Sequence, residues 1–359
     1  MIRNLHQKHG VASPATPLSE RWVSQILFNH EVIMKNQDVF KKIEDSIDSL
    51  KINDAEKKAF LEGVLRLKKQ KINLMITGAT GCGKSSTINA MFNSGVAKVG
   101  TGVDPETMDI QKYELENLVL WDSPGLGDGK EKDIIHAKGI IKKLNEIDGE
   151  GNPLIDLVLV ILEGGSRDLG TSYELINQVV IPNLGENAKD RILVAINQAD
   201  VAMKGRHWDH ENNKPMPELV KFLDEKALSV KRRIREATGV DVEPIYYSAG
   251  YKDEGSEQKP WNLSKLLFLI VKNTKEEKRL SYIGNISTDK EMWKDDDELM
   301  DYKKETQKSF QEVATHISKN TLAGAAAGAA IGSAVPVIGT AIGAAVGAVC
   351  GFIGGLFGW

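Results

Sequence analysis

The sequence contains little cysteine, has no excess of positive charge and begins without an apolar stretch. Only Cys82 and Cys350 occur among 359 residues, in such different settings that we expect no disulfide and a reducing compartment. A net charge of −4 gives no global basic field, so we expect no nucleic-acid partner. The residues before Trp22 lack the apolar region of a secretory signal, which favours the cytoplasm.

The apolar content, 41% of the chain, is sufficient for one large domain with appended segments. Short apolar runs alternate with helical stretches, a pattern that predicts a mostly parallel, doubly wound α/β sheet. The runs expected to form buried strands are 71–77, 118–122, 157–162, 191–197 and 244–248. We expect residues 110–115 to add an antiparallel edge strand, joined to the next strand by a turn at Glu116 and Asn117. The helix at 261–273 should close this domain, which spans residues 71–274.

Four further segments flank the domain. Residues 1–17 are expected to be loose, 18–70 to form helices and 275–320 to be a charged, solvated helical connector. The segment from Thr321 to Trp359 has no charged residue and contains ten of the 33 glycines, many of them four residues apart. This pattern predicts a Gly/Ala-rich helical hairpin bent at Pro336. Two locations stay open for this hairpin. It could insert in a lipid membrane, or it could pack against other helices of the same chain or of a second subunit.

A glycine-rich motif directly follows the first apolar run. It matches GxxxxGK[ST], whose backbone N–H groups surround phosphates at the start of a helix. Within it Lys84 should reach the β- and γ-phosphate oxygens, and Ser85 should ligate Mg²⁺. Cys82 is interpreted either as a redox-sensitive thiolate or as a small residue that fills the turn. The predicted phosphate-binding residues are Gly78, Ala79, Thr80, Gly81, Cys82, Gly83, Lys84, Ser85 and Ser86.

A second motif follows the run at 118–122. Asp122 should hold Mg²⁺ through water, and the Gly125 amide should bond the γ-phosphate. A threonine from the preceding loop should close over Mg²⁺ and the γ-phosphate. Thr101 and Thr107 are the candidates, and we choose Thr107 because it lies just before the edge strand.

The third motif distinguishes the base. Asp200, which ends the stretch beginning at Asn197 and Gln198, can accept hydrogen bonds from the two donors of guanine, which adenine lacks. Gln198 replaces the lysine usual at this position. The backbone of Ser248 and Ala249 should support the guanine carbonyl. We therefore expect GTP or GDP, with Mg²⁺, as the ligand.

The stretches GATGCGKSS, WDSPG, NQAD and SAG occur in the order of the translation-factor-related GTPases. Within that class GCGKSSTINAMF and LVLWDSPGLGD resemble the bacterial Era-like GTPases of the YfjP type, and also the immunity-related GTPases. The resemblance implies a P-loop fold and a molecular switch that hydrolyses GTP, with Lys84, Thr107 and Gly125 as catalytic residues. Leu126 stands where many relatives have a water-orienting glutamine, so we expect slow hydrolysis by the isolated protein.

Two alternatives remain open at this point. The chain could be a nucleotide-binding module that hydrolyses little or no GTP, or a ribosome- or RNA-associated protein of the Era-like type. The second is weakened because no basic domain follows Lys278. A homodimer or higher oligomer is also compatible with the sequence.

Overall fold

The computed structural model describes residues 70–92, 98–101, 110–127, 129–253 and 256–313, with a few separate helical positions between 54 and 69. Four expectations fall outside these described residues: those for residues 1–17, for most of 18–70, for Thr107 and for the tail at 321–359. Within the described part of the chain, no helix combines the length and apolar character needed to cross a bilayer.

A seven-stranded sheet forms the centre of the domain, in the order β2-β3-β4-β1-β5-β6-β9. The parallel pairings of β1 with β4 and β5, of β5 with β6 and of β6 with β9 confirm the expected mostly parallel sheet. The strands are β1 (Ile72–Gly78), β2 (Lys98–Thr101), β3 (Gln111–Glu114), β4 (Leu118–Asp122), β5 (Leu157–Glu163), β6 (Ile192–Asn197) and β9 (Ile245–Tyr246).

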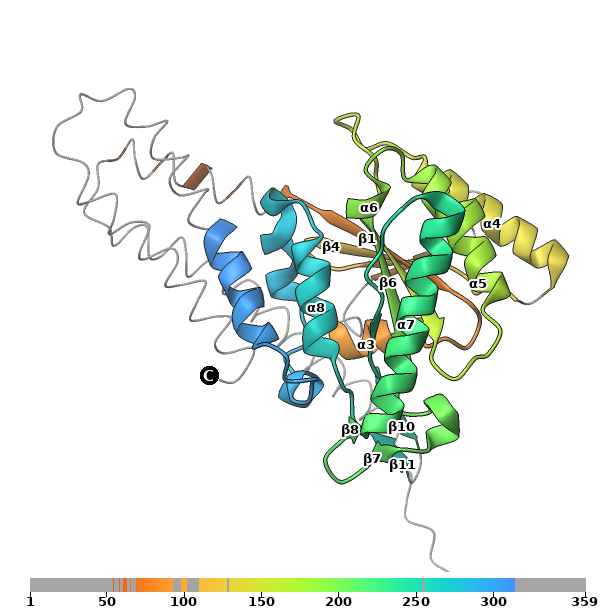
Figure 1. Ribbon diagram of the computed structural model, residues 1–359. Coiled ribbons are helices and arrows are strands. Elements are labelled where there is room, and N and C mark those ends of the chain that lie inside the picture. Colours follow the sequence, from red (N-terminus) through yellow and green to blue (C-terminus); the bar gives the residue numbers. More distant parts are fainter. Residues whose placement is uncertain are drawn as a thin grey trace, which may run out of the picture.

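Helices cover both faces of this sheet, as Figure 1 shows with α8 on the left and α4 on the right. One apolar core joins the sheet to α3 and α8, and a second joins it to α4, η2 and α7. Burial on both faces explains why β1, β4, β5 and β6 are almost continuous apolar runs. The helical elements are α3 (Lys84–Met91), α4 (Lys130–Leu144), α5 (Gly170–Glu174), η2 (Leu175–Val180), η3 (Ile181–Asn183), α6 (Ala188–Arg191), η4 (Ala202–Gly205), α7 (Pro217–Thr238) and α8 (Leu263–Lys272).

The expectation that 110–115 forms the edge of the sheet is wrong. β3 does pair antiparallel with β4, but β2 pairs with its other side, from Lys98↔Glu114 to Thr101↔Gln111. β2 has only four residues, KVGT, without the long apolar run that marks the buried strands. The last strand is also shorter than the expected 244–248, because only Ile245 and Tyr246 pair with β6.

The segment after Thr274 is more buried than its charge suggested. It forms η5 (Glu276–Asn285) and η6 (Lys290–Trp293), and residues 302–313 are helical. Tyr282 and Phe310 are fully buried against the same core as β1, β4 and α8. The segment therefore covers one face of the sheet and is not the solvated connector that we expected.

A small apolar cluster lies beyond the strand that ends at Asn197. The hairpins β7 (Trp208–Asp209) with β8 (Lys214–Pro215), and β10 (Tyr251–Asp253) with β11 (Ser256–Gln258), occur in this region. The Trp208 and Trp261 rings meet edge to face with centroids 5.8 Å apart. This cluster anchors the loops that carry Asp200 and Ser248.

Candidate nucleotide-binding site

The glycine-rich loop connects the end of β1 to the start of α3, the position that the motif requires. Gly83 has a φ of 87°, and a Cβ placed on it would lie 2.2 Å from Nδ2 of Asn197, so only glycine fits there. The Lys84 ammonium turns back over the loop and donates to the carbonyl oxygens of Gly78 and Ala79, at 3.3 and 3.2 Å. The loop thus holds its lysine beside the backbone that would surround a phosphate.

Ser85 and Asp122 meet at the same edge of the sheet. The Ser85 hydroxyl donates to Oδ2 of Asp122 at 3.4 Å, while the buried Oδ1 has no hydrogen-bond partner among the described residues. Burial raises the pKa of the Asp122 carboxyl, and the neighbouring Lys84 ammonium and Ser85 hydroxyl oppose that rise. A hydroxyl beside a carboxylate with an unpaired buried oxygen is the hard donor set that suits Mg²⁺. These residues therefore fit the expected metal.

The loop after β4 rests directly on the glycine-rich loop. The Thr80 N–H donates to the carbonyl oxygen of Leu126 at 3.1 Å. A Cβ on Gly125 would lie 2.4 Å from Oγ1 of Thr80, so a side chain at this position would separate the two loops. The Leu126 side chain, 5% exposed, packs into the core below α4 and does not line the cavity beside Lys84.

We predict that Leu126→Ala lowers stability and leaves the chemical step intact. Removing most of a buried leucine costs about 2–5 kcal/mol in the free energy of unfolding. The side chain has no polar group to lose from the site. Urea unfolding and GTP hydrolysis at saturating nucleotide measure the two effects. Ile134→Ala on the exposed side of α4 is the matched control, because Ile134 is 56% exposed and its replacement should change stability by about 0.5 kcal/mol or less. Normal stability with lost hydrolysis in the Leu126 variant would contradict this account.

Asn197 joins the glycine-rich loop to the predicted guanine-binding elements. Its Nδ2 donates to the carbonyl oxygen of Cys82 at 2.9 Å, and its Oδ1 accepts from the Ala249 N–H at 2.9 Å. Gln198, held at a φ of 62°, donates through Nε2 to the carbonyl oxygen of Gly81 at 2.9 Å. The Asn197 side chain therefore fixes its own motif relative to the glycine-rich loop and to the turn at Ser248 and Ala249, which are far apart in the sequence.

The Asp200 carboxylate is buried and oriented by a neighbouring hydroxyl. Asp200 is 6% exposed, and its Oδ1 accepts from the Ser248 hydroxyl at 2.6 Å. The sequence assigned only the backbone of Ser248 to this site. The structure adds a role for its side chain, because a carboxylate held by one hydroxyl has its second oxygen in a defined direction for a ligand.

A cavity of about 520 Å³ lies beside the phosphate end of this site. Besides residues of the two phosphate motifs it is lined by side chains that the sequence analysis did not single out, from β3 and α4. The lining residues are Lys84, Ser85, Gln111, Asp122, Ser123, Pro124, Gly125, Lys132, Ile135 and His136. No motif marks Gln111, Lys132 or His136, because only the packing of α4 and β3 brings them here.

The burial of Cys82 distinguishes its two interpretations, a redox-sensitive thiolate and a small residue that fills the turn. Its side chain is fully buried under the loop, and burial raises the pKa of the thiol to about 11. At pH 8 a thiol with that pKa is ionised to only about one part in a thousand, so it is a poor nucleophile. The turn-filling role therefore fits Cys82 better than a redox role.

This burial predicts slow alkylation of Cys82 in the folded protein. In a Cys350→Ser background, iodoacetamide at pH 8 should react with native Cys82 at least about 100-fold more slowly than with the urea-unfolded chain. Mass spectrometry over time measures both rates, and nucleotide should make little difference. Equal rates for the folded and unfolded chains would favour the redox-sensitive interpretation.

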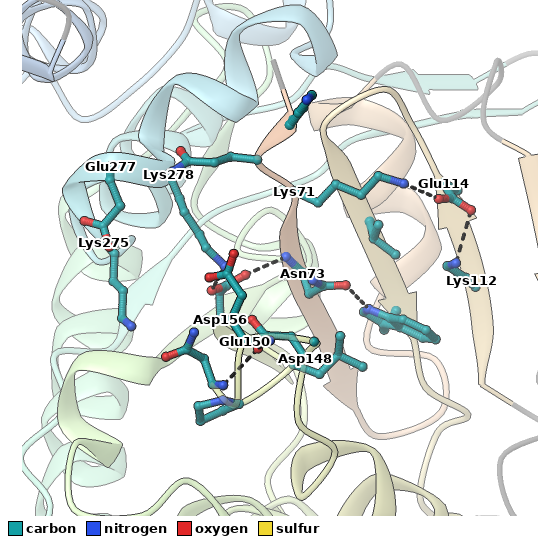
Figure 2. Close-up of a pocket in the computed structure, with 18 residues that line it drawn as sticks. Lys71, Asn73, Lys112, Glu114, Asp148, Glu150, Asp156, Lys275, Glu277 and Lys278 are labelled. Atoms are coloured by element: carbon teal, nitrogen blue, oxygen red, sulfur yellow. Dashed lines mark hydrogen bonds and ion pairs between the residues drawn. The ribbon is translucent and has the colours of Figure 1, made fainter. Parts of the chain in front are cut away.

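A larger cavity, of about 1210 Å³, lies at the opposite edge of the sheet (Figure 2). It is lined by Asn73 near the start of β1 and by Asp156 just before β5, so it is remote from the ends of strands that carry the motifs. Some of its charged side chains form ion pairs. Glu114 bonds both Lys71 and Lys112, at 2.6 and 3.1 Å, and Asp156 pairs with Lys278 of η5 at 2.7 Å (Figure 2). These pairs join separate elements of the fold and indicate no particular ligand.

Comparison with known proteins finds similarity over the part of the chain that contains the glycine-rich loop and the loop after β4. Residues 73–198 match the family described as 50S ribosome-binding GTPase. This range begins in β1 and ends just after Asn197, and the mostly parallel sheet with its flanking helices matches the P-loop GTPase fold.

The uncharacterized protein YfjP of Escherichia coli K12 is 28% identical over 173 residues, a match that covers 47% of this chain and 55% of YfjP. The chain thus matches about half the length of that relative. Interferon-inducible GTPase 1 of Mus musculus is 42% identical over 62 residues, which cover 16% of this chain and 15% of the mouse protein. The structure of Toc33 from Arabidopsis thaliana with GDP and Mg²⁺ aligns with 68% of this chain and 98% of Toc33, at 15% identity and a TM-score of 0.37.

Proposed function

We propose that the protein is a molecular switch that binds GTP with Mg²⁺ and hydrolyses it slowly. The observation that carries this proposal is the pair of hydrogen bonds made by Asn197. They join the phosphate loop, at Cys82, to the predicted base-binding turn, at Ala249. One ligand with a triphosphate at one end and guanine at the other fits elements joined in this way.

Each predicted residue has a separate role in the proposed reaction. Lys84 compensates charge on the β- and γ-phosphate oxygens, and the Gly125 N–H donates to the γ-phosphate as negative charge moves during the reaction. Ser85 and Asp122 would hold Mg²⁺, which would supply further positive charge to the phosphate oxygens. Thr107 remains our choice for the residue that closes over the metal, on sequence grounds alone.

The switch would operate through the loop after β4. A γ-phosphate bonded to Gly125 holds this loop in one conformation, and its departure releases it. Because the Leu126 carbonyl and the Thr80 N–H bond the two loops together, movement of one loop changes the position of the other. α4 begins at Lys130, only a few residues later, and would transmit that movement.

Nucleotide binding and phosphate release test the proposal directly. The full-length protein should bind fluorescent GTP and GDP in the presence of Mg²⁺ and prefer both to ATP by about 100-fold or more. Released phosphate should accumulate at roughly 10⁻⁴ to 10⁻² per second. Binding without release would support the nucleotide-binding module instead. Equal binding of GTP and ATP would refute the guanine assignment.

The tail at 321–359 supports a second part of the proposal, that the switch acts at a lipid membrane. The 23 residues after Pro336 would span about 34 Å as a helix, against about 30 Å for the hydrocarbon core of a bilayer. Cosedimentation with liposomes, in GDP and in a nonhydrolysable GTP analogue, tests this. Equal partitioning of the full-length protein and of a variant ending at Asn320 would contradict it and favour packing against protein.

A further inference from the structure

The turn that carries Ser248 is held by the residues just before α8. Ser248 and Trp261 exchange two backbone hydrogen bonds, from the Ser248 N–H at 3.0 Å and from the Trp261 N–H at 2.9 Å. The Ser248 hydroxyl in turn donates to Oδ1 of Asp200 at 2.6 Å. The direction of the carboxylate that we propose reads guanine therefore depends on where the chain around Trp261 lies.

Asn262 joins this region to an acidic segment, residues 295–297. Its backbone N–H donates to the carbonyl oxygen of Asp295 at 2.9 Å, and its Oδ1 accepts from the Asp297 N–H at 3.0 Å. Its Nδ2 donates to the carbonyl oxygen of Tyr246, at the end of β9, at 3.1 Å. Asn262 is fully buried and has a φ of 62°, a left-handed conformation that asparagine adopts more readily than most residues. One buried amide thus bonds both the strand that enters the Ser248 turn and the acidic segment.

A second buried asparagine connects the same two regions. Asn213 is 7% exposed, and its Nδ2 donates to the carbonyl oxygen of Pro260 at 3.0 Å and to Oδ2 of Asp295 at 2.8 Å. Its Oδ1 accepts from Nε2 of Gln258 at 2.6 Å. Pro260 directly precedes Trp261. The acidic segment therefore holds the chain on both sides of the residue that bonds the Ser248 turn.

The acidic segment is itself fixed by the helices that flank it. Oδ2 of Asp297 lies 2.6 Å from Nζ of Lys265 on α8, and its Oδ1 accepts from the Tyr302 hydroxyl at 2.7 Å. The Tyr302 ring packs on Phe268 of α8 with centroids 6.0 Å apart, so the helix at 302–313, blue in Figure 1, lies beside α8. Hydrogen bonds to charged groups are stronger than those between neutral groups. These contacts link the C-terminal helix to the acidic segment.

We infer that the acidic segment holds the Ser248 turn, and through it Asp200, in the orientation that reads guanine, an inference that rests on the proposed nucleotide binding. Asn262 and Asp297 are positioning residues, because they act through Ser248 and Asp200. When their contacts are broken, the turn moves and the hydrogen bonds from the base to the carboxylate weaken. The packing of the chain after α8 thereby sets how long guanine nucleotide stays bound.

GDP release from the full-length protein, and its preference for GDP over inosine diphosphate, test this inference. Inosine lacks the exocyclic amine of guanine, so the preference measures the hydrogen bond from that amine to Asp200. It should be about 10- to 100-fold in the unchanged protein, because the acceptor is charged. Asn262→Gly removes the side-chain bonds and keeps a backbone that tolerates a positive φ. This variant should release GDP about tenfold faster and lower the preference by about fivefold or more.

The preference separates positioning from a merely structural role. Partial unfolding would weaken both nucleotides alike and leave their ratio unchanged. Glu298→Gly is the matched control, because Glu298 is exposed and also has a left-handed φ, of 55°. Val313→Ala is the control for stability, since Val313 is 1% exposed in the C-terminal helix and its truncation lowers the free energy of unfolding. Both controls should keep the preference and the rate of GDP release in the folded protein.

Asp297→Asn is a second, milder variant that keeps the shape of the side chain and removes the charge beside Lys265. It should release GDP about threefold faster and lower the preference in the same direction. An unchanged preference in folded Asn262→Gly overturns the inference, and so does an unchanged preference in Asp297→Asn if the glycine variant does not fold. An equal loss of preference in Val313→Ala overturns it as well. Failure of the proposed function is distinguishable, because the unchanged protein would then show no preference for GDP or would bind neither nucleotide.

Discussion

Lys84→Ala is expected to lower the affinity for GTP and GDP by about 30- to 3,000-fold. The variant removes the ammonium that we propose faces the phosphates and would leave their charge less compensated, a loss on the order of 2–5 kcal/mol. The lysine is held in place before any ligand arrives, because it donates to the carbonyl oxygens of Gly78 and Ala79. The ligand therefore meets a charge whose conformational freedom is already reduced.

Titration calorimetry with GDP and Mg²⁺ measures this effect, and circular dichroism verifies the fold. Lys189→Ala is the matched control, since Lys189 is an exposed lysine on α6 and no motif contains it. Its affinity should not change. Affinity within about threefold of normal in Lys84→Ala would contradict the assignment of the glycine-rich loop.

Asp200→Asn is expected to change the preferred base from guanine to xanthine. The variant replaces one carboxylate oxygen by an amide donor, which would face the donors of guanine but can pair with the 2-oxo group of xanthine. GTP affinity should fall by about 3 kcal/mol, or roughly 100-fold, because hydrogen bonds to a charged group are lost. The Ser248 hydroxyl can keep its contact with residue 200, since a hydroxyl both donates and accepts.

Competition between GTP and xanthosine triphosphate for a fluorescent nucleotide measures the change. Asp190→Asn, at an exposed position on α6, is the control and should leave the preference for GTP intact. An unchanged preference in Asp200→Asn would mean that another group reads the base, and Gln198 would be the first to examine.

The main features of the fold could be predicted because four strands are buried on both faces. Such strands become apolar runs, and the predicted bounds 118–122 are those of β4. β2 could not be found, since a four-residue strand without an apolar run has no distinctive pattern. The packing after Thr274 was missed for a related reason. Its buried Tyr282 and Trp293 lie in 3₁₀ helices, which do not show the 3.6-residue period of an amphipathic α-helix.

The candidate site, too, could be predicted only in part from the sequence. The stretches proposed to bind phosphate and guanine could be recognised in the sequence, because those ligands require a fixed set of residues within a short stretch of chain. His136 and the Ser248 hydroxyl could not, since each depends on a contact between elements far apart in the sequence. The structure brings Asn197 to Cys82 and Ala249, and no spacing rule predicts that a single amide would join both.

The burial of residues 276–313 has a consequence for synthesis on the ribosome. The Ser281 hydroxyl donates to the carbonyl oxygen of Gln70, across 211 positions of sequence, and Tyr282 packs in the same core as β1. The part of this face that the segment covers therefore stays exposed until most of the chain has been translated, although α3 can cover another part earlier. Contacts of such long range form late, and chaperones bind apolar surface that is exposed during the delay. We expect the nascent domain to reach its final packing only after residue 313 has emerged.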